Sequence, residues 1–180
     1  MTDPRPLRSP LEGEPSLEGE SRLPALGPRG EGWLAAQIIL IGAIGLAGFG
    51  GLASARSWTP WGGVVSAAGV LAICAGFAIV GLAYAGLSSS FSPFPRPVPD
   101  GELVESGIYG RVRHPMYVGV VLGGLGWGLA CGSVVALAFG LALAFLFDAK
   151  ARREEAWLVA RHPGYAAYRS RTRRFIPSLY

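Results

Sequence analysis

The residues best suited to chemistry are concentrated in one short stretch, residues 107–119, which leads directly into a long uncharged segment. It contains Arg113, His114, Pro115 and Tyr117. Arginine supplies a fixed cation, histidine can accept or donate a proton near neutral pH, and tyrosine offers an aromatic face. Together these groups suit the binding of a flat or anionic ligand.

Proline lacks a backbone N–H and disfavours a helical residue before it, so Pro115 is predicted to be the first residue of a helix. The amides of Met116, Tyr117 and Val118 would then be unpaired donors at the helix start, able to hold a carboxylate or phosphate. Alternatively, the same stretch is a basic anchor that caps a membrane helix and faces lipid headgroups. The stretch alone is compatible with both interpretations.

Two adjacent acids, Glu154 and Glu155, follow the last apolar segment. The four-residue spacings of Asp148 with Arg152 and of Lys150 with Glu154 would also suit ordinary helix-surface pairing. Because the surrounding residues are strongly basic, the two acids instead favour a site that attracts a cation at the membrane edge.

The composition indicates a membrane protein. Of 180 residues, 51% are hydrophobic, and the mean hydropathy is +0.38. The net charge of +4 is compatible with nucleic-acid binding, but the basic residues gather at the edges of apolar segments, as in membrane proteins. No nucleic-acid partner and no metal site are expected.

The expected fold is all-α and polytopic, with four transmembrane helices over about residues 33–55, 61–87, 115–131 and 132–148. The last two would form a helical hairpin with arms slightly below the usual crossing length. A disordered tail is expected over residues 1–32, because it is rich in Pro, Gly and Glu. The remaining residues, 33–180, would form a single membrane domain.

The final helix has no breaker after its apolar part, so it is predicted to continue to Arg161 or His162, before Pro163. Basic residues are concentrated in the loop after the second span and in the C-terminal segment. The positive-inside rule places both, and the N-terminus, in the cytoplasm. We therefore expect a multi-pass protein of a bacterial-type inner or plasma membrane, with a cytoplasmic C-terminal helical cap.

Five motifs resemble the isoprenylcysteine carboxyl methyltransferase and phospholipid methyltransferase superfamily over about residues 101–177. They are Gly107-Ile108-Tyr109, Arg113-His114-Pro115-Met116-Tyr117-Val118-Gly119, Glu154-Glu155-x-x-Leu158, Tyr165-x-x-Tyr168 and Arg173-Arg174-Phe175-Ile176-Pro177. Their order and spacing after at least two spans make the resemblance specific, whereas each motif alone is weak.

The resemblance implies an integral membrane enzyme that uses S-adenosylmethionine. The residues that it places at the cofactor are Leu103, Val104, Tyr109, His114, Pro115, Met116, Tyr117 and Glu154. It implies catalytic roles for Arg113, His114 and Glu155, and acceptor binding by Lys150 and Arg153. Lys150 stands where the isoprenylcysteine enzymes have an arginine, and Gly101 where they have a histidine, and both departures count against an isoprenylcysteine substrate.

Methyl transfer is an in-line displacement, so the enzyme must align the donor and the acceptor and exclude water. A thiol or amine acceptor can require a general base, for which His114 or Glu155 is suitable, whereas a carboxylate acceptor requires none. The acceptor is expected to be lipophilic or small and to enter from the bilayer among membrane lipids. A phospholipid amine, a thiol and an isoprenoid carboxylate all remain compatible.

Two other classes remain open. Sterol and steroid reductases, which use NADPH, also carry an Arg-His-Pro-x-Tyr stretch, but typically have Asn after the proline, where this chain has Met116. The other class is a noncatalytic four-helix membrane protein, in which glycines serve close helix packing. The oligomeric state does not follow from the sequence under any of these interpretations.

Overall fold

The computed structural model describes residues 26–27, 30–53, 62–87, 92–94 and 103–177. Within these ranges the regular structure is helical, with a single isolated β-bridge between Val112 and Arg173. The predicted all-α class is therefore confirmed. Most of the predicted tail over residues 1–32 lies outside the described ranges, although the first helix begins within it, at Glu31.

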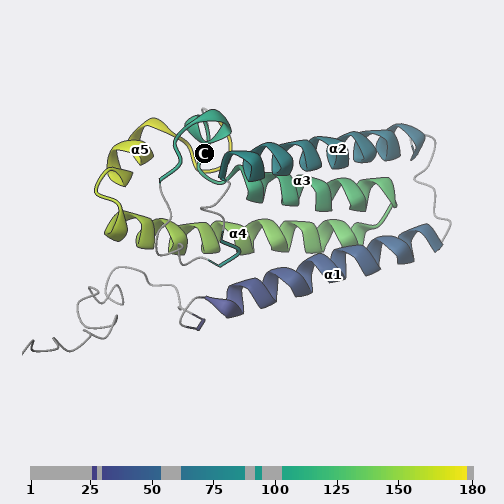
Figure 1. The fold of residues 1–180 in the computed structure, drawn as a ribbon. Coiled ribbons are helices and arrows are strands. Elements are labelled where there is room, and N and C mark those ends of the chain that lie inside the picture. The colour runs from purple at the N-terminus through teal and green to yellow at the C-terminus, as the bar shows by residue number, and fades with distance from the viewer. Residues whose placement is uncertain (1–25, 28–29, 54–61, 88–91, 95–102, 178–180) are drawn as a thin grey trace, which may run out of the picture.

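Four long helices lie side by side in the order α2, α3, α4, α1 (Figure 1). Their bounds are Glu31–Ala53 for α1, Gly62–Leu87 for α2, Pro115–Ala130 for α3 and Val134–Arg161 for α4. In the described part of the chain, α1, α2 and α4 are long and apolar enough to cross a membrane. The protein is thus a multi-pass membrane protein.

The third predicted span, α3, is the shortest of the four. Its 16 residues extend about 24 Å, less than the roughly 30 Å of a hydrocarbon core. Its partner α4 has 28 residues, about 42 Å, because it continues without a break to Arg161 as predicted. The predicted boundary at residue 148 therefore marks where charged residues begin and not where the helix ends.

The α3–α4 turn is closed by Ser133, which caps α4. Its hydroxyl accepts from the amide of Ala136 at 3.1 Å and donates to the carbonyl of Ala47 in α1 at 2.8 Å. The preceding Gly132 has a φ of +64°, which favours glycine. The predicted hairpin is thus fixed both by its own cap and by α1.

Paired glycines bring α2 and α3 into backbone contact. A Cβ atom at Gly76 would lie 2.6 Å from the carbonyl oxygen of Gly119, and one at Gly126 would lie 2.7 Å from that of Gly69. A side chain at these positions would push the two helices apart. The small residues of α3 therefore serve close packing, which holds the start of α3 firmly against α2.

Two short helices cover one end of the bundle. The 3-10 helix η3, Gly107–Gly110, lies beside α2, and α5, Tyr165–Arg171, follows the end of α4. Figure 1 shows both at the end where α2 finishes and α3 begins. The motifs singled out in the sequence therefore meet at this end.

Candidate functional site

A cavity of about 180 Å³ lies at the covered end of the bundle. Every helix contributes at least one lining residue, for example Gln37, Leu87, Tyr109, Tyr117, Lys150 and Tyr165. The lining is mixed, because hydroxyl, ammonium and carboxylate groups stand among aromatic and aliphatic side chains. Such an apolar cavity with a few polar groups is typical of a small-molecule site.

The C-terminal segment fixes the loop before α3. Val112 and Arg173 form a parallel bridge, the amide of Arg113 donates to the carbonyl of Arg173 at 2.8 Å, and the amide of His114 donates to that of Arg174 at 3.0 Å. These bonds satisfy backbone groups that would otherwise be unpaired just before a helix. The backbone around His114 is therefore held in place by residues about 60 positions later.

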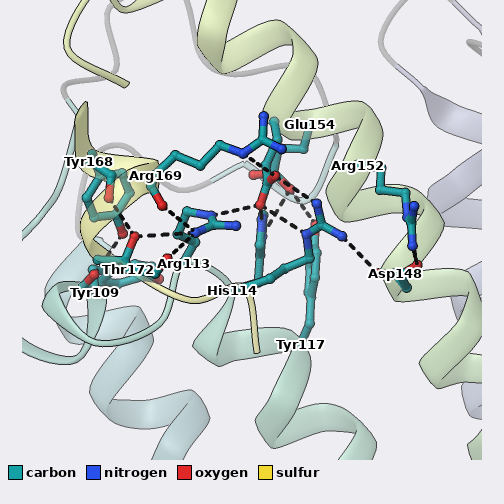
Figure 2. A network of polar contacts seen from close by, with 12 residues as sticks. Tyr109, Arg113, His114, Tyr117, Asp148, Arg152, Glu154, Tyr168, Arg169 and Thr172 are labelled. Atoms are coloured by element: carbon teal, nitrogen blue, oxygen red, sulfur yellow. Dashed lines mark hydrogen bonds and ion pairs between the residues drawn. The ribbon is translucent and has the colours of Figure 1, made fainter. Parts of the chain in front are cut away.

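Glu155 is the centre of a buried ionic network, part of which is shown in Figure 2. Its carboxylate lies 2.9 Å from Nε of Arg113, 3.2 Å from Nε2 of His114 and 3.0 Å from Nη2 of Arg174. Only 2% of the residue is exposed. A buried carboxylate is stable only when it is paired and hydrogen-bonded, so these contacts tie the loop and the C-terminal segment to α4.

Glu154 faces the cavity and has a different partner. The Tyr117 hydroxyl donates to its Oε2 at 2.7 Å, and Nδ1 of His114 lies 3.8 Å from the same oxygen. Consecutive residues of a helix project about 100° apart, so the two adjacent acids point in different directions and approach opposite nitrogens of the His114 ring. Glu154 supplies a carboxylate to the cavity, whereas Glu155 supports the wall behind His114.

A stack of three rings forms one wall of the cavity. The ring of Tyr117 lies parallel to that of His114 at 5.2 Å and to that of Phe147 at 4.4 Å, with interplanar angles of 9° and 7°. Because Glu155 holds one end of the His114 ring and Glu154 holds the Tyr117 hydroxyl, the orientation of the stack is fixed. It presents a rigid aromatic surface to a ligand.

Lys150 places a cation at the cavity and is itself only 1% exposed. Its Nζ donates to Oε1 of Gln37 in α1 at 2.7 Å and to the carbonyl of Pro93 at 2.9 Å, and lies 5.2 Å from the centre of the Tyr117 ring. A buried ammonium requires such partners. The same group can recognise an anionic part of a bound molecule.

Tyrosines of η3 and α5 close the cavity on its outer side. The Tyr168 hydroxyl donates to the carbonyl of Tyr109 at 2.8 Å, and the Tyr109 hydroxyl donates to that of Ala83 at 3.3 Å. Burial raises the pKa of each of these tyrosines to about 12, and the nearby Glu154 charge adds to the effect at Tyr109. Burial also raises the pKa of Tyr165. The three hydroxyls therefore remain neutral.

Most of the residues predicted for the site lie together at this cavity. They are Leu103, Val104, Tyr109, Arg113, His114, Pro115, Met116, Tyr117, Lys150 and Glu154. Two are placed elsewhere. Glu155 lies in the ionic network, and the guanidinium of Arg153 lies 4.9 Å from the ring of Trp157, one helical turn later. That cation–π contact explains why Arg153 does not turn to the cavity.

The helix start was predicted correctly at Pro115, but one of its three expected free amides is bonded. The amide of Val118 donates to the carbonyl of His114 at 3.3 Å. His114 is the N-cap residue, and the N-cap carbonyl accepts the first intrahelical bond. The prediction for Val118 is therefore wrong, and any anion at this helix start would meet the amides of Met116 and Tyr117.

Sequence reasoning missed Gln37, Phe147 and His162, which also line the cavity. Gln37 is a polar, uncharged residue in an otherwise apolar run, and a polar residue in a membrane helix is a usable signal for a functional position. His162 lies in a second Arg-His-Pro-x-Tyr sequence, at residues 161–165, and is the C-cap residue of α4. Phe147 carries no such signal, since phenylalanine is common in apolar helices.

The side chains of the cavity fit S-adenosylmethionine by their chemistry. The cofactor carries a sulfonium and an ammonium, for which Glu154 is a counter-charge, and a carboxylate, for which the free amides at the α3 start are suitable. Its adenine matches the aromatic stack and the aliphatic side chains of Leu103 and Val104. Each chemical part of the cofactor thus has a counterpart.

The phospholipid methyltransferase family model matches residues 64–163, more than half of the chain. Protein-S-isoprenylcysteine O-methyltransferase of Schizosaccharomyces pombe is 37% identical over 97 residues, which are 53% of this chain and 41% of that protein. The cobalt-zinc-cadmium resistance protein CzcN of Cupriavidus metallidurans is 43% identical over 82 residues, 43% of this chain and 36% of that protein.

A second metal-resistance protein, the nickel-cobalt-cadmium resistance protein NccN of Alcaligenes xylosoxydans xylosoxydans, is 37% identical over 79 residues, 43% of this chain and 37% of that protein. The match to each of these relatives therefore covers about two fifths of the relative's own length. The region matched by the family model contains the loop before α3, all of α3 and α4, and both glutamates.

Proposed function

This chain belongs to the phospholipid methyltransferase family, and on that premise we propose that it transfers a methyl group from S-adenosylmethionine to a lipophilic or small acceptor at a membrane surface. The observation that carries the proposal is the placement of Glu154. Among the described residues that line the cavity, Glu154 supplies the one carboxylate, beside aromatic rings and apolar side chains. Such a carboxylate attracts the cationic part of a sulfonium cofactor while the rings provide a desolvated surface.

When bound, S-adenosylmethionine would supply an activated methyl group, whose carbon an acceptor nucleophile attacks in line while S-adenosylhomocysteine leaves. The protein's part is to orient the acceptor and to exclude water. The stacked rings of His114, Tyr117 and Phe147 form a fixed wall against which an acceptor aligns. Tyr109 and Tyr168, which are buried at the outer side, keep solvent from the reacting atoms.

Lys150 favours an acceptor that carries an anionic group. Its ammonium lies at the cavity beside the Tyr117 ring, where it can pair with a carboxylate or phosphate of the acceptor. A carboxylate acceptor is already ionised at neutral pH and needs no general base. For a thiol or amine acceptor, His114 is the better base, because Glu155 is occupied by its ion pairs.

We place this end of the bundle in the cytoplasm, together with both termini, in a bacterial-type inner or plasma membrane. The support is electrostatic, because the arginines of the loop before α3, the end of α4 and α5 all lie at this end. Basic residues are enriched on the cytoplasmic side of membrane proteins.

The test is calorimetric binding of S-adenosylmethionine, of its demethylated product S-adenosylhomocysteine and of NADPH to the detergent-purified protein. We expect S-adenosylmethionine and S-adenosylhomocysteine to bind. Glu154→Gln and His114→Ala should each weaken the binding of S-adenosylmethionine by about tenfold or more, because hydrogen bonds to charged groups contribute roughly 1.5–3 kcal/mol. Glu105→Gln is the matched control, because Glu105 pairs with Arg171 outside the cavity.

Binding of NADPH alone would reject the methyltransferase in favour of a membrane reductase. Binding of none of the three would favour a noncatalytic membrane protein. If the cofactor binds, the acceptor class is then identified by methyl transfer from labelled S-adenosylmethionine to a lipophilic carboxylate, thiol or amine.

A further inference from the structure

The two ring nitrogens of His114 have different surroundings. Nε2 lies 3.2 Å from Oε1 of Glu155, whereas Nδ1 lies 3.8 Å from Oε2 of Glu154. His114 and Glu154 line the cavity, and Glu155 does not. The Nε2 edge of the ring is therefore turned to the ionic network, and the Nδ1 edge lies on the side of the cavity.

Glu155 can only accept hydrogen bonds. Its carboxylate receives Nε of Arg113 at 2.9 Å, and Nε and Nη2 of Arg174 at 3.2 and 3.0 Å. Two guanidinium groups in contact with a carboxylate keep it ionised, and an ionised carboxylate has no proton to donate. The 3.2 Å contact with His114 is consequently a hydrogen bond in which Nε2 carries the proton.

The other nitrogen, Nδ1, makes no hydrogen bond within the part of the chain that the structure describes. Its 3.8 Å separation from Glu154 is too long for one, and that carboxylate oxygen accepts the Tyr117 hydroxyl instead. Although His114 is the N-cap residue of α3, its side chain does not cap the helix. In a neutral imidazole the nitrogen without the proton is an acceptor, so Nδ1 presents its lone pair on the cavity side.

From this asymmetry we infer that Glu155 is a positioning residue, which fixes the tautomer of His114 so that Nδ1 accepts the proton released in methyl transfer. A carboxylate that holds one nitrogen of a histidine base in this way also stabilises the imidazolium that forms. The inference rests on the proposed function and narrows its acceptor to a nucleophile that carries a proton, namely a thiol or an amine. An anionic group elsewhere on the same molecule can still pair with Lys150.

The step balances in atoms and in charge. The sulfur or nitrogen of the acceptor forms a bond to the methyl carbon, the bond from that carbon to the sulfonium sulfur breaks, and its electron pair stays on the sulfur. S-adenosylhomocysteine leaves with a neutral thioether, and the proton of the acceptor moves to Nδ1 of His114. The positive charge that the sulfonium loses thus appears on the imidazole, which lies between two carboxylates.

The neighbours of the ring are drawn from three parts of the fold. Tyr117 of α3 stacks on it, and Phe175 of the C-terminal segment lies at 5.9 Å. The charged groups around it in the described residues are Glu154 and Glu155 of α4, Arg113 of the loop before α3, and Arg174 of the C-terminal segment. Because Glu155 is already paired with both arginines, it does not require an imidazolium as a further partner.

The first test is histidine ¹⁵N NMR of the full chain in detergent at about pH 8, where an ordinary histidine is neutral. Protonated and unprotonated ring nitrogens have well separated ¹⁵N chemical shifts. The chain has two histidines, so His162→Gln leaves the signals of His114 alone. We expect a protonated Nε2 and an unprotonated Nδ1.

Two variants show whether Glu155 sets this pattern. Glu155→Gln should lose it, because a side-chain amide can donate to Nε2 as well as accept from it. Asp148→Asn is the matched control, since it removes the charge of another acid that pairs with Arg174 but does not contact His114, and it should keep the pattern.

Transfer kinetics test the role of Nδ1, with the acceptor found by labelled transfer. His114→Gln retains an amide that can donate to Glu155 but has no basic nitrogen. At saturating S-adenosylmethionine we expect its kcat to fall by about a hundredfold or more, as for the loss of a general base. Glu155→Gln should also lower kcat, whereas Asp148→Asn should not.

Four results would overturn the inference. They are a protonated Nδ1 in the unmodified protein, an unchanged NMR pattern in folded Glu155→Gln, an unchanged kcat in His114→Gln, and transfer to a carboxylate acceptor alone, which releases no proton. The spectrum of the unmodified protein decides the tautomer even if Glu155→Gln does not fold. Failure of S-adenosylmethionine to bind would instead reject the proposed function, and would leave the position of the proton as the NMR result gives it.

Discussion

Replacement by glutamine should affect the two adjacent acids of α4 in opposite ways: at Glu155 it should mainly lower stability, and at Glu154 it should mainly weaken cofactor binding. Glu155→Gln removes the charge of a side chain that is 3% exposed and lies within 3.2 Å of Arg113, His114 and Arg174. Removing one partner from a buried ionic group costs about 3–5 kcal/mol, because the remaining charges stay buried. Glu154→Gln removes a charge from a side chain that is 25% exposed, and should leave the stability nearly unchanged.

For a chain of this size, 1 kcal/mol corresponds to about 2–4 °C in the unfolding midpoint. We therefore expect Glu155→Gln to lower the midpoint by about 6–20 °C and Glu154→Gln by less than about 2 °C. The assay is thermal unfolding in detergent, followed by tryptophan fluorescence. S-adenosylmethionine binding, measured well below both midpoints, should show the reverse order, with the larger loss in Glu154→Gln.

A double variant checks the cause of the destabilisation. Arg113→Gln in the Glu155→Gln background removes a buried cation that has lost its counter-charge, so the combined loss should be clearly less than the sum of the single losses. The reasoning is refuted if Glu155→Gln unfolds within 2 °C of the unmodified protein, or if the two single variants are destabilised equally.

Three further outcomes are expected. Lys150→Met should raise the KM for an anionic acceptor in the transfer assay by about tenfold or more, while the affinity for S-adenosylmethionine changes less. An unchanged KM would show that Lys150 does not bind the acceptor. Gly76→Ala should lower the free energy of unfolding in a denaturant titration, because the new Cβ would lie 2.6 Å from a backbone oxygen of α3 and push the two helices apart. The matched control Gly81→Ala has open space around it, so it should be neutral or stabilising by up to about 1 kcal/mol. Burial raises the pKa of Tyr109 and Tyr168 to about 12. The stability that their neutral form contributes is therefore complete below pH 10 and is lost as the pH rises toward 12. Absorbance at 295 nm should show fewer tyrosines ionising near pH 10 in the folded protein than in the unfolded chain.

The sequence was informative where a local rule acts alone. Pro115 marked the start of α3 because proline restricts its own backbone and the residue before it. The uninterrupted run into the charged segment predicted that α4 continues to Arg161, and the structure confirms it. Glu31 extends α1 by two residues beyond the predicted start, because an acid in the first helical turn is favoured by the helix dipole.

The parts that could not be predicted depend on packing between distant elements. The spacing of Glu154 and Glu155 alone does not show which acid faces the cavity, because that depends on the rotation of α4 against α3; the resemblance placed Glu154 at the cofactor, and Glu154 lines the cavity. Gln37 meets Lys150 only because α1 lies beside α4. The guanidinium of Arg153 lies over the ring of Trp157, four residues later, and does not line the cavity. Its role in acceptor binding stays a prediction.

The bridge between Val112 and Arg173 has a consequence for the order in which the protein matures. The loop before α3 emerges from the ribosome well before the segment that holds it, and roughly 60 residues at 5–20 residues per second take on the order of 3–12 s. During that interval the first helices can already be inserted in the bilayer, while His114 lacks its backbone partner in the C-terminal segment. The newly made protein therefore passes through a stage in which its first helices can be embedded while the loop before α3 is not yet held, and this stage ends only when Arg173 and Arg174 have been made.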